Sequence, residues 1–292
     1  MNGGTYMVSD IPLIIRPAAE NDRKQLASLI HFETFVHRHL DWRAPLDWVG
    51  FSPCLVAEQN GSLVATLISP PDPPGIAWIR LFAVSTNFDT KEAWKRLWPE
   101  ARARMAGDRD MTIAAIPLQY WFRELLDMSG FQQINQVVML LWERANSIPE
   151  NSAQQIGLRP MNYDDLRIVG ELDEVAFGEL WRNSLDSLEL AFKQAAIATV
   201  AEEEGRLVGY QISTASPMGG HLARLAVAPT HQGKGIGYSL VRDTLYQFTR
   251  RGAVRVTVNT QLDNVGSLAL YKKAGFKDTK EKYPVYWFKL HP

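Results

Sequence analysis

The sequence has little of what marks secreted, membrane-bound or nucleic-acid-binding proteins. Its one cysteine, Cys54, excludes an internal disulfide and is expected to be a small buried residue. The 31 Lys and Arg nearly balance 32 Asp and Glu without forming a basic stripe, so we expect no nucleic-acid partner. No stretch approaches about 18 consecutive apolar residues, and no apolar signal segment stands near the N-terminus. We therefore expect a cytoplasmic protein with no membrane partner.

What the chain does contain is a strand, a glycine-rich loop and a helix in direct succession. Residues 222–238 read LARLAVAPTHQGKGIGY, with glycine at positions 233, 235 and 237. The first amide groups of a helix lack internal partners, and the helix dipole favours negative charge there. Glycines let a backbone approach a pyrophosphate closely. The segment therefore predicts an anion-binding site. A glycine-rich turn that binds no ligand is the alternative interpretation of the same residues.

The spacing of the glycines in this loop distinguishes between the known nucleotide-binding motifs. Tyr238 takes the last glycine position of the dinucleotide fingerprint, and the P-loop pattern is absent. The pattern present, from Gln232 to Gly237, is Q-x-x-G-x-G. It resembles the acyl-CoA pyrophosphate loop of the GCN5-related N-acetyltransferase (GNAT) superfamily. The run from Asn264 to Phe276 is similar to a second family motif, N-x-x-A-x-x-L-Y-x-x-x-G-F, with Ser267 at the usual alanine.

The resemblance covers residues 156–287 and implies a fold. Each GNAT domain is an α/β (α+β) unit in which a mixed, mostly antiparallel twisted sheet is flanked by helices, and strands four and five splay apart. The order of expected elements agrees, with two further strands expected within residues 276–288.

The resemblance also implies a binding site for acetyl-CoA, with no metal. The backbone of strand four would pair with the pantetheine arm, and the loop amides would hold the pyrophosphate. Lys234 adds charge or is simply solvated, and Asn264 binds the cofactor, caps a helix or does both. The residues implied in cofactor binding are Leu225, Ala226, Val227, Gln232, Gly233, Lys234, Gly235, Ile236, Gly237, Asn264 and Tyr271.

Four residues are candidates for the chemistry. Tyr271 matches the family's general acid, which protonates the departing thiolate. Counting back from the loop reaches His221 as a base, if no bulge precedes Leu225; a structural histidine is the alternative. Asn259 would end strand five and orient an attacking water. The amide of Val227, or alternatively that of Ala226, would stabilise the oxyanion.

An internal repeat indicates that the chain carries this fold twice. At an offset of 144 residues, Val56-Ala57-Glu58 matches Val200-Ala201-Glu202, and Arg80-Leu81 matches Arg224-Leu225. We expect residues 1–145 to form a degenerate, non-catalytic GNAT-like domain for support or substrate recognition. Residues 156–292 would form the catalytic domain, after a polar linker from Arg144 to Gln155. The first copy has lost the motif residues: Phe88, Lys91, Ala93, Gln119, Leu126 and Ala77 stand where the second has Gln232, Gly235, Gly237, Asn264, Tyr271 and His221.

These features predict an acetyl-CoA-dependent N-acetyltransferase that acts on a primary amine by direct attack in a ternary complex. The acceptor would be a small molecule or a peptide, and the protein a monomer or homodimer. Three alternatives stay open: transfer of a longer acyl or aminoacyl group, as in mycothiol synthase-like relatives; acetylation of protein N-termini or lysines; and an acyl-CoA sensor without catalysis. Retention of both Asn264 and Tyr271 favours the enzyme.

Overall fold

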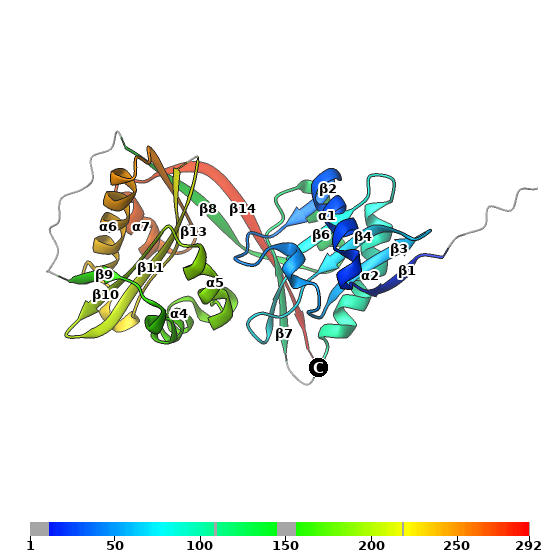
Figure 1. Cartoon of the computed structure of the whole chain (residues 1–292), viewed down its shortest axis with the longest axis horizontal. Coiled ribbons are helices and arrows are strands. Elements are labelled where there is room, and N and C mark those ends of the chain that lie inside the picture. Colours follow the sequence, from blue (N-terminus) through cyan, green and yellow to red (C-terminus); the bar gives the residue numbers. More distant parts are fainter. Residues whose placement is uncertain (1–11, 108–109, 145–155, 218, 292) are drawn as a thin grey trace, which may run out of the picture.

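The protein has two lobes joined by a pair of long strands (Figure 1). The structure is a computed structural model that describes residues 12–107, 110–144, 156–217 and 219–291. The expected linker, apart from Arg144 itself, lies outside the described residues. Within these ranges, no helix is both long enough and apolar enough to cross a membrane.

The two halves share most of their order of elements, which confirms the tandem GNAT fold expected from the repeat. They differ in that residues 35–38 form a strand where the second half has a second helix, and residues 76–84 form two short strands where the second half has one. The first half comprises β1 (Ile14–Pro17), α1 (Arg23–Phe32), β2 (Phe35–Arg38), β3 (Cys54–Gln59), β4 (Ser62–Ile68), β5 (Ile76–Trp78), β6 (Leu81–Val84), α2 (Thr90–Met105), β7 (Met111–Ala115), α3 (Tyr120–Met128) and β8 (Gln132–Glu143). The second comprises β9 (Gly157–Pro160), α4 (Leu166–Trp181), α5 (Leu185–Gln194), β10 (Ile197–Glu203), β11 (Arg206–Ser216), β12 (Gly219–Val227), α6 (Ile236–Arg250), β13 (Arg255–Gln261), α7 (Val265–Lys273) and β14 (Lys277–Leu290).

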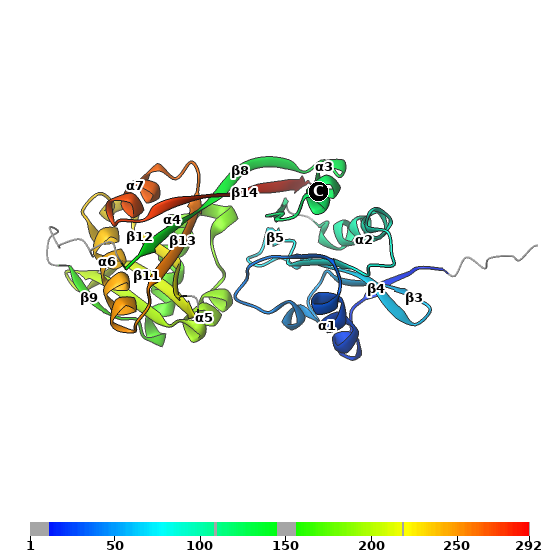
Figure 2. The ribbon, with the colours of Figure 1, turned by 90° about the horizontal axis from the view of Figure 1, so that it is seen from above.

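The last strand of each half crosses to the other lobe (Figures 1 and 2). β8 pairs with β13 of the second half, whereas β14 pairs with β7 of the first, and the two exchanged strands pair with each other. One nine-stranded sheet results, in the order β5-β7-β14-β8-β13-β12-β11-β10-β9. The expectation of two strands within residues 276–288 was wrong, because β14 is one long strand that accommodates a register shift between Asp278 and Lys282.

In both halves one arginine forms ion pairs with two carboxylates at equivalent positions, which supports the repeat. Arg16 contacts Asp22 at 2.7 Å and Glu58 at 2.8 Å. In the second half, Arg159 contacts both Asp165 and Glu202 at 2.7 Å. In each half the arginine thus joins the first strand to the segment that opens the first helix and to the strand paired with the first, so the same local architecture is built twice.

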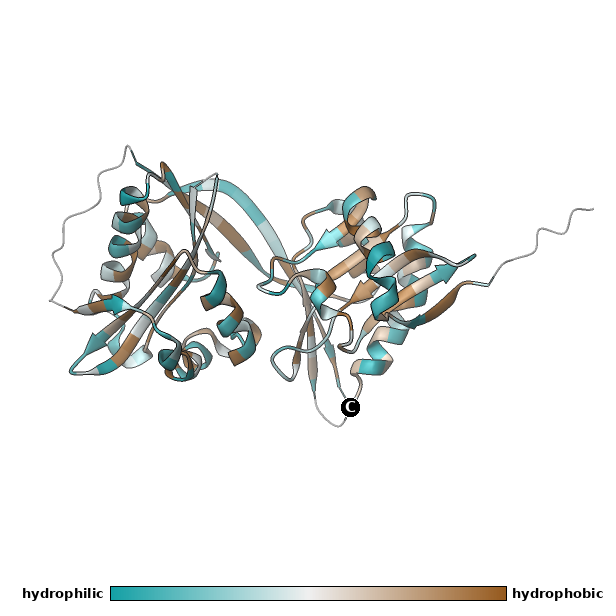
Figure 3. Cartoon of the chain, viewed as in Figure 1, coloured by the Kyte–Doolittle hydropathy of each residue, from teal (hydrophilic) through white to brown (hydrophobic). Residues whose placement is uncertain are grey.

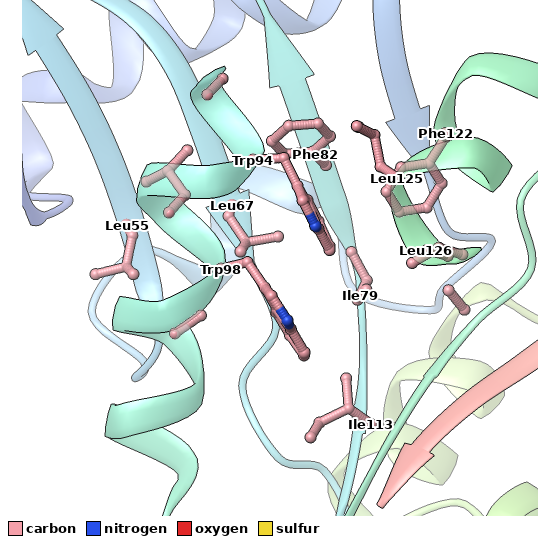
Figure 4. Close-up of a cluster of buried hydrophobic side chains, with 14 of the residues drawn as sticks. Leu55, Leu67, Ile79, Phe82, Trp94, Trp98, Ile113, Phe122, Leu125 and Leu126 are labelled. Atoms are coloured by element: carbon pink, nitrogen blue, oxygen red, sulfur yellow. The ribbon is translucent and has the colours of Figure 1, made fainter. Parts of the chain in front are cut away.

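The first lobe has an aromatic core under α2 (Figure 4). The apolar face of α2 is buried and includes Trp94, Leu97, Trp98, Ala101 and Met105. Pro99 lies inside this helix without ending it. Hydrophobic residues concentrate in the strands, while the helices turn hydrophilic residues outward (Figure 3). Cys54 is buried as expected, and burial raises the pKa of its thiol to about 12.

In the first lobe, β2 pairs along the strand edge that, by the resemblance, would face a cofactor's pantetheine arm. β6 pairs with β4 on one edge and with β2 on the other. Leu81 lies opposite Ile68, as Arg224 lies opposite Ile212 in the second half, so β6 corresponds to residues 224–227 of β12. The strand edge that the family offers to acyl-CoA is therefore already paired with the chain's own residues 35–38.

His37 holds β2 in this position. It is fully buried, stacks on Phe122 with ring centroids 4.1 Å apart, and donates from Nε2 to the carbonyl of Ile79 at 3.1 Å. Its Nδ1 has no partner among the described residues. Because a second proton there would place a charge in an apolar site, burial lowers the pKa of His37 to about 4.

This buried histidine predicts a pH dependence of stability. Between pH 6.5 and about 4, the unfolded chain binds a proton at His37 that the folded chain excludes. The free energy of unfolding therefore falls as the pH falls through this window, by about 3 kcal/mol from this group. Denaturant unfolding across the window should show a smaller acid-induced loss for His37→Gln than for the wild type. The matched control is His291→Gln at an exposed histidine, and an equal loss in wild type and His37→Gln would contradict the assignment.

Candidate active site

The parallel pairing between β12 and β13 is short. Only Gly220 to Leu222 pair with Val256 to Val258. Beyond them β12 continues beside β11 as far as Val227, while β13 continues beside β8 as far as Gln261. The two strands thus part in the way expected of GNAT strands four and five. On the side facing β13, residues 224–227 have no strand partner within the described part of the chain.

The alternation of backbone direction identifies which amides face this opening. The amide of Ala228 donates to the carbonyl of Val208 on β11 at 2.8 Å. Since hydrogen-bonding direction alternates along an antiparallel strand, Ala226 also faces β11, whereas Leu225 and Val227 face away from it. The carbonyl of Val227 accepts a hydrogen bond from Gln232 Nε2 at 3.2 Å, which fastens the loop to the strand.

The three loop glycines serve different geometric needs. Gly233 and Gly235 adopt φ of 78° and 87°, a left-handed region that side chains rarely enter, and Gly235 is the N-cap of α6. Gly237 lies in the first turn of α6, where a Cβ would come within 3.2 Å of Leu270 on α7. The loop therefore ends at a helix N-terminus whose first residues are Ile236 and Gly237.

Lys234 has a carboxylate partner that the sequence did not reveal. Its Nζ lies 3.3 Å from Glu203 Oε2 at the end of β10, and His231 Nε2 lies 3.2 Å from the same oxygen. The Lys234 side chain is still 44% exposed. The positive charge of the loop is thus held beside the helix N-terminus rather than being free in solvent.

Helix α7 carries the second motif. Asn264 is its N-cap and accepts a hydrogen bond from the amide of Ser267 at 3.0 Å, so the capping role is present. Tyr271 is 5% exposed and packs in one cluster with Leu222 of β12 and Val258 of β13. Tyr271 thus belongs to the same buried cluster as residues of both strands near the point where the strands part. Burial raises the pKa of its phenol, which keeps the hydroxyl protonated at neutral pH.

His221 and Asn259 lie on the face of the sheet that points away from α6. Leu222, Val256 and Val258 pack with α6, so the intervening residues point the other way. His221 Nδ1 lies 2.9 Å from Thr257 Oγ1, and burial lowers the pKa of the imidazole. The register shift between Ile212 and Ser213 leaves Ala223 as an extra residue, so the assumption of no bulge before Leu225 was wrong. The count from the loop therefore no longer supports His221, whose candidacy rests on its place on the same face as Asn259.

Asn259 lies one residue beyond the last paired residue of β13, at the point where the strands part. β13 runs on to Gln261, so Asn259 does not end the strand as expected. Its Oδ1 is buried and finds no hydrogen-bond partner in the described ranges. A buried acceptor of this kind costs free energy unless a donor is supplied, which makes the oxygen a candidate ligand contact.

A buried network that the sequence analysis missed anchors α4 to β12. Arg224 donates to both carboxylate oxygens of Asp173, at 2.6 and 2.7 Å, and to the carbonyl of Trp181 at 2.7 Å. Tyr210 donates to the same carboxylate, and the guanidinium stacks on Phe177. The retained pair Arg80-Leu81 and Arg224-Leu225 was the available signal, since Arg80 also forms a buried pair, with Asp41 at 2.9 Å.

Two further observations concern a pocket outside the candidate site and the grouping of side chains that could bind a metal. A pocket of about 360 Å³ lies where residues 38–47 meet α5, and neither the glycine loop nor His221 lines it. In the part of the chain that the structure describes, no three His, Cys, Asp or Glu side chains are grouped to hold a metal ion.

Comparisons with known proteins agree with this geometry. The family model described as Acetyltransferase (GNAT) family matches residues 166–276. An uncharacterised N-acetyltransferase of Methanocaldococcus jannaschii is 30% identical over 125 residues, 42% of this chain and 79% of its own length. A mycothiol acetyltransferase of Clavibacter sepedonicus is 26% identical over 168 residues, 53% of this chain and 55% of the relative.

A solved tandem GNAT protein from the clavulanic acid biosynthesis pathway has a TM-score of 0.64 at 17% identity, covering 96% of this chain and 99% of its own. At this identity the likeness concerns the fold alone. The chain spans about half the length of the first curated relatives that it matches. The two motifs, the parted strands, the matched family model and the archaeal relative lead to one conclusion: the chain belongs to the acetyltransferase (GNAT) family.

Proposed function

We propose that this protein is a cytoplasmic N-acetyltransferase that transfers an acetyl group from acetyl-CoA to a primary amine by direct attack in a ternary complex. The observation that carries the proposal is the open edge of β12, which leads directly into a glycine loop at a helix N-terminus. Backbone amides on an open strand edge suit a pantetheine arm, and amides at a helix N-terminus suit a pyrophosphate. The acceptor is a small molecule or a peptide, and the protein acts as a monomer or homodimer.

The residues that would hold the donor are the ones around this edge. Leu225 and Val227 present backbone groups to it, with Ala226 between them, and Gln232 fixes the loop against Val227. The amides of residues 233–237 face the pyrophosphate, Lys234 adds positive charge, and Asn264 shapes the start of α7. Acetyl-CoA supplies an acetyl group already activated as a thioester.

The remaining candidate residues transfer a proton, stabilise the oxyanion or accept a hydrogen bond. Tyr271, kept protonated by burial, donates the proton that the departing sulfur needs. His221, kept neutral by burial, takes the proton from the amine, directly or through a water. The amide of Val227 faces the opening and stabilises the oxyanion, a role for which Ala226, which faces β11, is poorly placed. Asn259 Oδ1 accepts a hydrogen bond from the amine or from that water.

We assign all of this chemistry to residues 156–292 and a non-catalytic role, in support or substrate recognition, to residues 1–145. Two observations support the division. The first half lacks the motif residues, and β2 pairs along the edge where its acyl-CoA would lie.

Loss of the Tyr271 hydroxyl should slow turnover without weakening donor binding. Thiol release from acetyl-CoA, measured over a panel of primary amines, is expected to fall roughly 10²-fold in Tyr271→Phe, because the leaving sulfur loses its acid. The affinity for acetyl-CoA, measured by calorimetry, should change little. Tyr246→Phe, at an exposed tyrosine of α6, is the matched control and should behave as wild type. Binding of acetyl-CoA without thiol release for any amine would favour a sensor instead.

The pH profile of kcat should report His221. Because its pKa is lowered, the base is neutral at pH 7, and kcat should fall only as the pH drops below the ordinary histidine value of 6.5. His221→Gln should lose roughly 10²-fold in kcat and lose this acid limb, since Gln does not titrate. An unchanged acid limb in the variant would remove His221 as the base, while His291→Gln serves as the control.

A further inference from the structure

The exchanged strand β8 brings residues of the first half into the sheet beside the proposed acceptor site. In the β8–β13 ladder, Met139 lies opposite Asn259 and Leu141 lies opposite Thr257. Val138, Leu140 and Trp142 pack with α6 on one face. Met139 and Leu141 must therefore share the other face with His221, Thr257 and Asn259.

These two apolar side chains are not fully buried. Met139 and Leu141 are both partly exposed, unlike their buried neighbours Val138 and Leu140. The residues His221, Thr257 and Asn259 beside them are also partly exposed, although the Asn259 Oδ1 itself is buried. An accessible apolar strip thus lies directly beside the groups that would handle the reacting amine.

The end of α4 continues this apolar surface and is held in place by a hydrogen bond and by ring contacts. Trp181 packs against the hydrophobic cluster that includes Val137 of β8, and its ring lies 5.3 Å from that of Trp78 of the first half, between centroids. Arg224 donates a hydrogen bond to the Trp181 carbonyl at 2.7 Å, and His39 stacks on Trp78 with ring centroids 4.7 Å apart. Aromatic surfaces from both halves therefore meet next to β8.

We propose that the first half completes the acceptor site and selects amines carried on an apolar skeleton. Met139 and Leu141 contact the hydrocarbon part of the acceptor, while Asn259 Oδ1 receives a hydrogen bond from its amine. This inference rests on the proposed N-acetyltransferase activity. It assigns to the degenerate half a direct role in specificity through a strand that it donates to the other lobe.

The test compares two acceptors of matched length, n-hexylamine and 5-aminopentan-1-ol, which differ in an apolar or a hydroxyl end. Loss of apolar contact changes kcat/KM by roughly tenfold or more, so the wild type should prefer hexylamine by about that factor. Met139→Gln and Leu141→Gln should each bring the ratio toward one. Ile134→Gln makes the same kind of change on β8 before the segment that pairs with β13, and should keep the wild-type preference.

Three outcomes have distinct meanings. A lost preference in both Met139→Gln and Leu141→Gln, with acetyl-CoA affinity retained in calorimetry, supports the proposal. Equal use of both amines by the wild type, or the same ratio in Met139→Gln and Ile134→Gln, overturns it while leaving N-acetyltransferase activity intact. Absence of thiol release with every amine would overturn the proposed function itself, and this inference with it.

Discussion

The feature on which the proposed site depends most is the short pairing between β12 and β13. Three residue pairs hold the strands together, and then the strands part and leave the amides of Leu225 and Val227 facing an opening. Unpaired strand backbone near a core carries a free-energy cost unless a partner arrives. The adjoining loop, the N-terminus of α6, Tyr271 and Asn259 are all arranged around this edge. The proposed activity follows from the kind of partner that such an edge accepts.

The first half shows what happens when the same edge is satisfied within the chain. Phe82 and Val84 hold the positions of Leu225 and Val227, and β2 pairs with them through Val84 opposite Phe35 and Phe82 opposite His37. The copy thus keeps the fold while its opening is filled. Through the exchanged strands β8 and β14 it stays joined to the second half, and its donated strand borders the residues we assign to the acceptor.

The sequence predicted the family, the repeat and the outline of the site, because Gln232 to Gly237 and Asn264 to Phe276 are local patterns with fixed spacing. It did not predict the strand exchange, because residues 277–290 read as strand whichever lobe they join. It did not predict β2, since four residues carry no signal for the edge they will cover. Asp173 and Glu203 were missed for the same reason: their importance arises from partners distant in sequence, Arg224 and Lys234.

Residue-resolved amide hydrogen exchange, with and without acetyl-CoA, tests the central claim most directly. The account predicts that the amides of Leu225 and Val227 gain protection when acetyl-CoA is added, because they acquire a partner along the open edge. The amides of Phe82 and Val84 should be protected in both states, because β2 already pairs with them. No gain at Leu225 and Val227, or a gain at Phe82 and Val84, would contradict the account.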